Sequence, residues 1–281
     1  MFFDRSASCI IRFEDGSEIE FKNLNIEFDV RKTLTQETNI ASIKIYNLSQ
    51  DSMNRVQESG SLVYLFAGYT ADSGEEIIFT GNISKVVHSK QNENTTLEIE
   101  SGDGDAVFRN VVIVLEYEEK VDARDILRDI TTRAGITIRD YENVPFKMYQ
   151  QGFAFVGQIT EAIDKVTKFL GYEWSIQNNE LQIVRKGKPS IVSINLVSIR
   201  EGLLERPNRN TDAENRMSGD VKAPGWSLKT LLNPKYEPGG QVDIDTELIK
   251  GLFKIESVRH LGSLYSNNWT SEIDVIEVQG G

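Results

Sequence analysis

The sequence contains little of what most disulfide and metal sites require. Among 281 residues there are one cysteine, Cys9, and two histidines, His88 and His260. A single thiol cannot form a disulfide within the chain, and one thiol with two distant histidines makes no zinc-binding pattern. We therefore expect a reducing compartment, with Cys9 as a small buried residue of the first strand.

Long apolar runs are also missing. Charged residues follow directly on Met1-Phe2-Phe3, and no window approaches 18 consecutive apolar residues. The sequence therefore predicts neither a signal peptide nor a membrane span, and we expect synthesis in a cytoplasm.

Positive charge is scarce as well. Lys and Arg number 31 against 43 Asp and Glu, which gives a formal net charge of −12. A protein that wraps nucleic acid needs cations along the phosphates, so this balance argues against specific DNA binding. A solvated acidic surface explains the charge, and so would acidic channel walls that let DNA pass without sticking.

The sequence is rich in β-strand patterns, of which Ile77–Ser89 is the clearest. Phe79, Ile83 and Val87 fall on one side of a two-residue period and Val86 on the other, as in a half-buried strand. Gly81 within it indicates a bulge or a close backbone approach.

A related pattern returns at Leu252–Leu261. Aligning His88 with His260 also aligns Val86 with Val258 and Ile83 with Ile255. We interpret this as one β-domain plan that the chain uses twice.

The patterns divide the chain into three predicted domains. Residues 1–114 read as a β-barrel or sandwich, with a hairpin turn at Asp15-Gly16 and a short helix capped by Ser49. Residues 115–188 read as an inserted α/β unit with two helices, ended by Gly135 and Gly171, and a hairpin through Asn178-Asn179. Residues 189–281 return to β pattern.

A long polar loop is expected at about 207–220, because this stretch has almost no apolar side chains to bury. Long loops of this kind are usually functional or disordered. We favour contact with a partner protein and select four candidate interface residues: Asn208, Arg209, Asn210 and Trp226.

The carboxylates form no complete catalytic or metal-binding motif. Asp103 and Asp105 lie in a segment that a calcium loop would use, but no further carboxylate follows at the required spacing, so we favour a plain turn. His88 and His260 have no second ligand nearby and are expected to be hydrogen-bonded or exposed. We expect no metal, no cofactor and no enzymatic activity.

Several segments together carry a resemblance to a known family. Leu231–Pro234 forms a short turn, Pro238-Gly239 a reversal before a strand, and Gly251 opens a strand that ends in Val258-Arg259-His260. The remaining segments are Ile43–Leu48, Ala67–Tyr69 and Phe79–Ile83. The combination resembles the baseplate hub proteins of contractile-tailed bacteriophages, which are related to the hub module of type VI secretion spike proteins.

The resemblance implies a mainly β fold with an inserted α/β unit and two tail-tube-like β-barrel domains. It implies a homotrimer whose six barrels form a pseudo-six-fold ring, adapting the hexameric tail tube to the trimeric spike and lining the channel for DNA passage. The implied partners are the spike protein, tail tube or tube-initiator proteins and other baseplate proteins, with no membrane insertion by this chain. The implied location is the virion tail baseplate, after assembly in the host cytoplasm.

Two other functions stay open at the level of sequence. A tail-tip adhesin or carbohydrate-binding β module would be expected to group its aromatic side chains, whereas Trp174, Trp226 and Trp269 are scattered. A tail-associated cell-wall hydrolase would need paired carboxylates. The candidates for that role, expected as ordinary solvated side chains on turns or strand faces, are Asp103, Asp105, Asp243 and Asp245.

Overall fold

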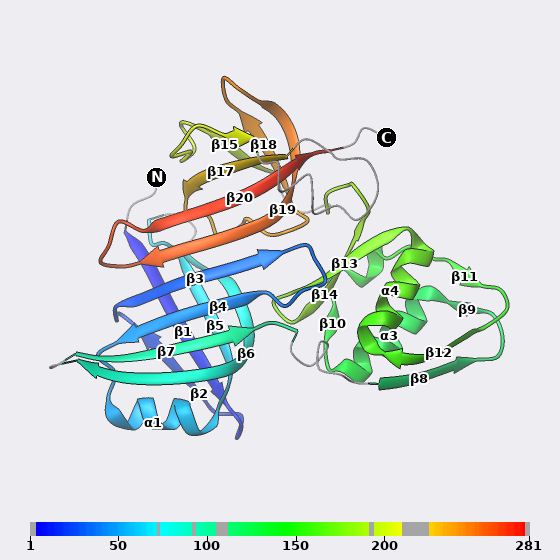
Figure 1. The fold of residues 1–281 in the computed structure, drawn as a ribbon, viewed down its shortest axis with the longest axis horizontal. Helices are drawn as coiled ribbons and strands as arrows, with labels where there is room; N and C mark the ends of the chain where they lie inside the picture. The colour runs from blue at the N-terminus through cyan, green and yellow to red at the C-terminus, as the bar shows by residue number, and fades with distance from the viewer. Residues whose placement is uncertain are drawn as a thin grey trace.

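A computed structural model describes residues 4–71, 74–91, 94–104, 112–190, 194–209 and 225–278. The chain is mainly β, as the sequence predicts, with a long sheet on one side and a smaller helix-containing part on the other (Figure 1). None of the described helices is long and apolar enough to cross a membrane. We refer to residues 4–104 as the first β part, 112–190 as the middle part and 194–278 as the second β part.

The first β part packs its strands and one helix around a single core. Its strands are β1 (Arg5–Phe13), β2 (Glu18–Lys22), β3 (Ile26–Thr33), β4 (Ile40–Tyr46), β5 (Gly60–Tyr69), β6 (Gly74–Gln91) and β7 (Asn94–Gly102). The predicted turn at Asp15-Gly16 joins β1 to β2, and Gly16 adopts a φ of 81° that glycine tolerates without strain. Cys9 is fully buried on β1, and burial raises the pKa of its thiol to about 12.

Helix α1 (Gln50–Ser59) begins at the predicted cap. The Ser49 hydroxyl accepts a hydrogen bond from the Ser52 backbone N–H at 3.2 Å. Met53 and Val56 point into the core of the first β part, as their spacing predicts, and Gly60 follows the helix.

The middle part has a hydrophobic core of its own, in which α3 and α4 pack together (Figure 1). Its elements are β8 (Val112–Tyr117), β9 (Val121–Asp122), α3 (Ala123–Ala134), β10 (Thr137–Ile138), η1 (Tyr141–Asn143), β11 (Met148–Tyr149), β12 (Phe153–Gln158), α4 (Ile159–Leu170), β13 (Tyr172–Gln177) and β14 (Glu180–Arg185). Gly135 and Gly171 end the two helices in the left-handed conformation, as predicted. Asn178 and Asn179 both have positive φ in the predicted turn between β13 and β14.

The second β part has a smaller core. Its strands are β15 (Ile194–Ser198), β16 (Asn208–Arg209), β17 (Gly225–Leu231), β18 (Gln241–Asp245), β19 (Lys250–Ser263) and β20 (Trp269–Glu277). The predicted reversal lies before β18, where Gly239 has a φ of 83°. Val242, Ile255 and Val258 are buried in this core.

The two β parts share one 13-stranded sheet instead of forming two separate barrels. Its main path runs β16-β17-β20-β19-β3-β4-β7-β6-β5-β1-β2, and the antiparallel ladder between β19 and β3 joins the two parts. Among the described strands, no ladder closes either part into a barrel.

The expected alternation along β6 is interrupted. The pairing of β6 with β7 shifts register between Ile83 and Lys85, so Ile83 and Val86 pack against the same core and not on opposite faces. Gly81 lies at a close backbone approach, as predicted, because a Cβ there would stand 2.7 Å from the Gly102 carbonyl oxygen. The bulge between Ile83 and Lys85 is what the simple two-residue period missed.

Candidate assembly interface

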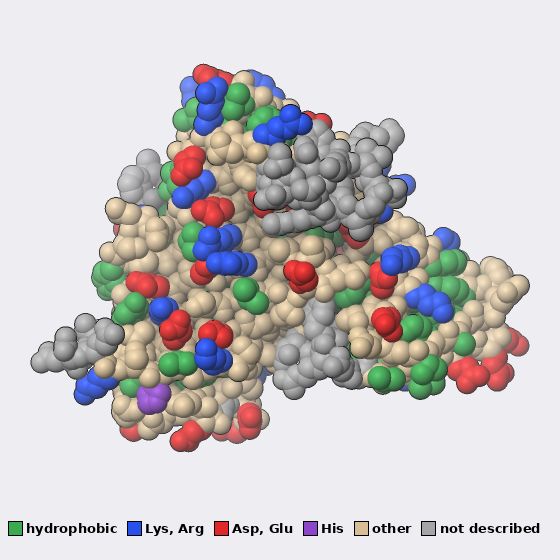
Figure 2. Space-filling view, viewed as in Figure 1, with side chains coloured by type: hydrophobic (Ala, Val, Ile, Leu, Met, Phe, Trp, Pro, Cys, Tyr) green, Lys and Arg blue, Asp and Glu red, His purple; other side chains and the backbone are tan. Residues whose placement is uncertain are grey.

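One face of the sheet carries polar side chains across strands of both β parts. Red and blue side chains are interspersed on this face (Figure 2). The acidic members are Glu27, Asp29, Glu98, Glu100, Glu272 and Asp274, and the basic members are Arg31, Lys44, Lys85, Lys229 and Arg259. The charges on this face are therefore nearly balanced, unlike the acidic wall that the net charge suggests.

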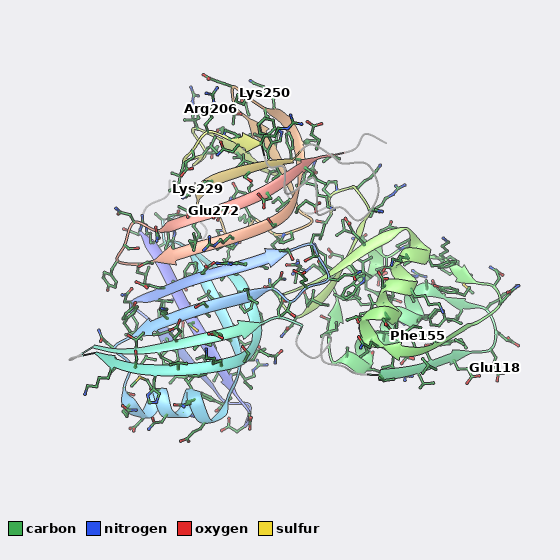
Figure 3. All side chains as sticks on the ribbon, in the orientation of Figure 1. Glu118, Phe155, Arg206, Lys229, Lys250 and Glu272 are labelled. Atoms are coloured by element: carbon green, nitrogen blue, oxygen red, sulfur yellow. The ribbon has the colours of Figure 1, made fainter. Side chains whose placement is uncertain are left out.

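Cross-strand ion pairs account for this balance. Lys229 of β17 and Glu272 of β20 point toward each other (Figure 3) and lie 3.5 Å apart. Lys44 of β4 and Glu98 of β7 form the same kind of pair across two adjacent strands, 3.3 Å apart. Exposed pairs of this kind contribute little stability, so their main effect is to lower the net field above the sheet.

The sheet contains the same arrangement of four strands twice. The first repeat is β3-β4-β7-β6 and the second is β16-β17-β20-β19, in the same spatial order. The chain also visits them in the same order, since β5 precedes β6 and pairs with it, as β18 precedes β19 and pairs with it.

The two repeats also agree in register. The β6 ladder with β7 shifts between Ile83 and Lys85, and the β19 ladder with β20 shifts between Ile255 and Ser257. These are the positions that the alignment of His88 with His260 makes equivalent. The same ladders make Lys44 equivalent to Lys229 and Glu98 to Glu272, so the two ion pairs occupy matching sites.

The joint between the repeats is the ladder of β3 with β19. The Arg259 guanidinium donates to both carboxylate oxygens of Asp29, from Nε at 2.9 Å and from Nη2 at 2.7 Å. On the other face His260 lies opposite Val30, fully buried, with Nδ1 2.8 Å from the Ser271 hydroxyl. Burial, reinforced by the charge of Lys32, lowers the pKa of His260 to about 3, so this histidine is neutral.

We call the two repeats together the repeated wall, and among the described strands a strand edge is left open at each of its outer ends. On β6, β5 pairs with Gly74–Asn82, and no described strand continues along that side over Lys85–Gln91. This is the side that β3 covers on β19. His88 and Val87 are exposed there, in contrast to the buried His260. At the opposite end, β16 is the last strand of the path.

Three of the four predicted interface residues lie at this second open end. Asn208 and Arg209 form β16 and are not part of a loop, because they pair with Ser227 and Trp226 of β17. Trp226 is half-buried against the core of the second β part. Asn210 and residues 211–220 of the predicted loop lie outside the described residues.

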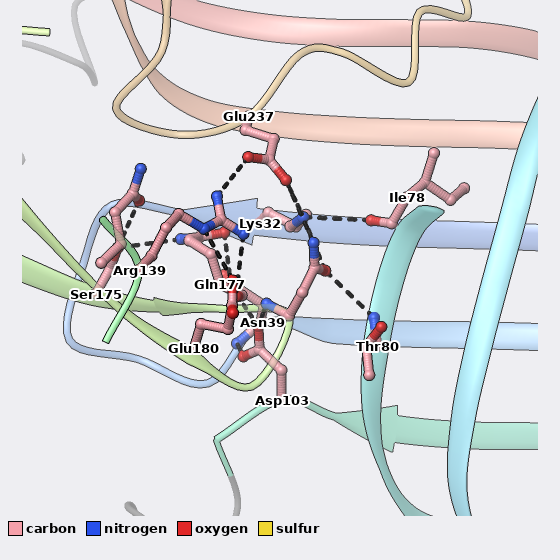
Figure 4. A network of polar contacts seen from close by, with 12 residues as sticks. Lys32, Asn39, Ile78, Thr80, Asp103, Arg139, Ser175, Gln177, Glu180 and Glu237 are labelled. Atoms are coloured by element: carbon pink, nitrogen blue, oxygen red, sulfur yellow. Dashed lines mark hydrogen bonds and ion pairs between the residues drawn. The ribbon is translucent and has the colours of Figure 1, made fainter. Parts of the chain in front are cut away.

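A buried ionic network ties the three parts of the chain together (Figure 4). Lys32 of β3, 1% exposed, donates to the Ile78 carbonyl at 3.3 Å and to the Asn178 side-chain oxygen at 3.1 Å. Its ammonium lies 3.6 Å from Glu237, which also accepts a 2.6 Å hydrogen bond from Arg139. Burial alone raises the pKa of Glu237, but Lys32 and Arg139 outweigh it and lower the pKa.

Asp103 is a second buried acceptor in this network, which corrects the expectation of a solvated turn residue. It accepts hydrogen bonds from Asn39, through the backbone at 3.1 Å and the side chain at 2.9 Å, and from the Asn178 backbone at 3.0 Å. Burial raises its pKa to about 6 against the effect of these bonds. The residues that bury Asp103 are distant in sequence, so the local pattern could not reveal them.

The remaining chemical candidates are not brought together. Asp243 and Asp245 alternate with the buried Val242 and Ile244 along β18, and Asp105 lies outside the described residues. In the part of the chain that the structure describes, no three His, Cys, Asp or Glu side chains gather as a metal site would require.

The sequence patterns did not indicate Lys32, Arg139 and Glu237 as members of a site. A signal for Lys32 exists, because it continues the inward positions Val30 and Phe28 of a two-residue period. A lysine at a core position of a strand indicates a buried partner.

Comparison with known proteins gives structural matches only. No family model and no curated protein matches the sequence. The tail protein from Neisseria meningitidis MC58 matches with a TM-score of 0.63 at 12% identity, covering 98% of this chain and 97% of its own. The 43 kDa tail protein of prophage MuSo2 from Shewanella oneidensis matches with a TM-score of 0.64 at 10% identity, covering 97% and 98%.

An E. coli component of the type VI secretion system also matches, with a TM-score of 0.58 at 8% identity over 91% of this chain and 74% of its own. That protein is described as structurally similar to the T4 bacteriophage tail proteins gp27 and gp5. The fold of this chain is therefore the one found in phage tail proteins and in this secretion component, as its sequence resemblance to baseplate hub proteins implies.

Proposed function

We propose that this protein is a structural hub subunit of a contractile tail baseplate. Three copies form a ring that adapts a six-fold tail tube to a three-fold spike. The observation that carries the proposal is the four-stranded repeat, present twice in one chain with the same strand order and the same bulge.

The symmetry follows from the repeat. Two repeats in each of three copies give six similar wall segments, so one end of the ring suits a six-fold partner while the three-fold identity of the copies suits a trimeric spike. Such a ring uses a head-to-tail contact, in which different surfaces of one copy meet on its neighbours. The two open ends of the repeated wall, on β6 and β16, are different surfaces of this kind.

In the ring each β part contributes one four-stranded wall segment, with the strands behind the wall as its outer layer. The domain limits we propose remain 1–114, 115–188 and 189–281. The polar face of the sheet lines the channel. Because its charges are paired across strands, DNA would pass it without a strong field of either sign.

The proposed partners are the trimeric spike protein, tail tube or tube-initiator proteins and other baseplate proteins. The proposed location is the virion tail baseplate, after assembly in the host cytoplasm. The matched structures are tail and secretion-system proteins, which supports a structural role without catalysis. An adhesin gains no support, because Trp174 and Trp269 are each only 1% exposed.

Native mass spectrometry and light scattering of the full chain test the proposal. We expect a trimer, alone or with its spike protein, with interfaces above about 2,000 Å² per pair, as in obligate assemblies. Electron microscopy of the trimer should show six similar wall segments around one channel. A chain that stays monomeric at high concentration, both alone and mixed with the spike, would contradict the proposal.

A further inference from the structure

The strand pairing that joins the two repeats within one chain predicts the strand pairing between neighbouring copies. In the β3–β19 ladder, Val30 lies opposite His260 and Asp29 lies opposite Leu261. If the repeat continues around the ring, the strand equivalent to β3 pairs with the strand equivalent to β19 at each boundary between copies. Those strands are β16 of one copy and β6 of the next.

The ladders fix the equivalent residues. On the β6 side, His88 corresponds to His260 and Ser89 to Leu261, because β6 and β19 share the same register with β7 and β20. On the β16 side, Val30 lies opposite Ala41 of β4, as Arg209 lies opposite Trp226 of β17. The preceding positions, Asp29 and Asn208, correspond in the same way.

We propose that β16 of one copy pairs antiparallel with the open edge of β6 of the next copy, with Ser89 opposite Asn208 and His88 opposite Arg209. This inference rests on the proposed ring and adds to it the strands, the direction and the register of the contact. The pairing supplies backbone hydrogen bonds to an edge that otherwise stays open.

The chemistry of this contact differs from that of the joint inside the chain. Arg259 and Asp29, which form the two-bonded ion pair there, correspond to Val87 and Asn208 at the boundary between copies. Val87 is 43% exposed in the single chain, and a neighbouring copy paired in this register would cover it. The contact between copies therefore lacks the ion pair that Arg259 and Asp29 form within the chain.

Cysteine cross-linking tests the register. Two pairs of single variants are mixed in equal amounts and oxidised: Ser89→Cys with Asn208→Cys, and His88→Cys with Arg209→Cys. Hydrogen-bonded and non-hydrogen-bonded positions alternate along an antiparallel ladder, so one of two adjacent pairs has the closer spacing that a disulfide needs. Cys9 is buried and does not compete.

We expect a covalent dimer from at least one pair, and none from Lys85→Cys mixed with Asn208→Cys, which lies four residues out of register. Because each variant carries one new thiol, the bond must join two copies. A trimer by native mass spectrometry without cross-links at either pair would overturn the register and leave the ring standing. Absence of both trimer and cross-links would overturn both.

A charge exchange gives a second readout. Asn208→Asp alone should weaken trimer formation about tenfold, since it places one unpaired charge in the contact. Val87→Arg alone should weaken it less, because Glu98 lies opposite residue 87 within the same copy. The double variant should recover most of that loss, because it recreates between copies the pair that Arg259 and Asp29 form within the chain. No recovery in the double variant, with circular dichroism unchanged, would refute the pairing.

Discussion

The two four-stranded repeats have similar strands in the sheet, but different elements cover their apolar faces. Both have the same strand order, the same bulge and the same lysine–glutamate pair across two strands. Behind the first lie α1 and the β1–β2 hairpin. Behind the second lie a short turn at Pro238-Gly239 and β15, which runs parallel to β18, whereas β1 runs antiparallel to β5.

This difference shows which part of the fold is constrained. A wall segment has to match its neighbours in register, because a slip of one residue would turn every polar side chain to the wrong face. The outer layer only has to bury the apolar face, which many arrangements can do. The repeats should therefore respond alike to changes in the wall and differently to changes in the core.

The largest expected difference concerns Trp269. It belongs to β20 but packs edge-on against Phe28 and Tyr69 of the first β part, at centroid distances of 5.6 and 6.4 Å. Trp269→Ala should cost about 4 kcal/mol of unfolding free energy. Thr95→Ala, at the equivalent position of the first repeat, should cost below about 1 kcal/mol. Urea unfolding measures both, and similar losses would mean that Trp269 does not seal the joint.

A smaller difference is expected at the bulge. Ile255 is 1% exposed, whereas the equivalent Ile83 is only partly buried against its core. Ile255→Ala should cost about 3 kcal/mol and Ile83→Ala about 1 kcal/mol, in proportion to the apolar contact that each loses. Equal values in the same urea titration would indicate that the two cores are equally packed.

Replacing His260 and replacing His88 should change the pH dependence of stability differently. The pKa of His260 is lowered to about 3 by burial, so below pH 6.5 the unfolded chain binds a proton that the folded chain does not. Stability is lost as pH falls, by about 2 kcal/mol between pH 7.5 and pH 5. His260→Gln should remove this loss from the pH dependence of the urea midpoint, and His88→Gln should keep it.

Asp103 acts with the opposite sign in the same range. Because its pKa is raised to about 6, its contribution to stability falls as pH rises from about 4 to 6. The histidine test therefore uses the difference in unfolding free energy between each variant and the wild type at each pH. It does not rely on the pH dependence of one protein alone. An unchanged acid response in His260→Gln would show that this histidine binds its proton over the same pH range in the folded and unfolded chain.

The smallest expected effect tests whether the lysine–glutamate pairs of the two repeats are equivalent. Double-mutant cycles for Lys44 with Glu98 and for Lys229 with Glu272 should each give a coupling of about 0.5 kcal/mol, because both pairs are exposed. A coupling in one repeat and none in the other would mean that the two wall positions are not equivalent.

The sequence predicts the parts of this fold that depend on neighbouring residues. The Ser49 cap, the glycines that end α3 and α4, and the Asn178-Asn179 turn are local devices, and each lies where its pattern indicates. The alignment of His88 with His260 is local as well, since it compares two short strands.

What the sequence does not predict depends on distant residues. The β3–β19 ladder joins the two β parts into one sheet instead of two separate barrels. The sequence pattern of neither strand indicates that it pairs with the other. Asp103 resembles a turn residue until Asn39 and Asn178 cover it. Asn208 and Arg209 read as part of a polar loop, although two residues of that stretch pair as a strand with β17.

The β3–β19 joint also sets the order in which the chain can fold. Arg259 and Asp29 are 230 residues apart, so β3 has no partner on that side until β19 has left the ribosome. Contacts between such distant residues form slowly, because a long loop must close first. During that interval the open edge of β3 can pair with another nascent chain, so we expect assembly in the cell to require either fast synthesis as far as β19 or protection of this edge by a chaperone.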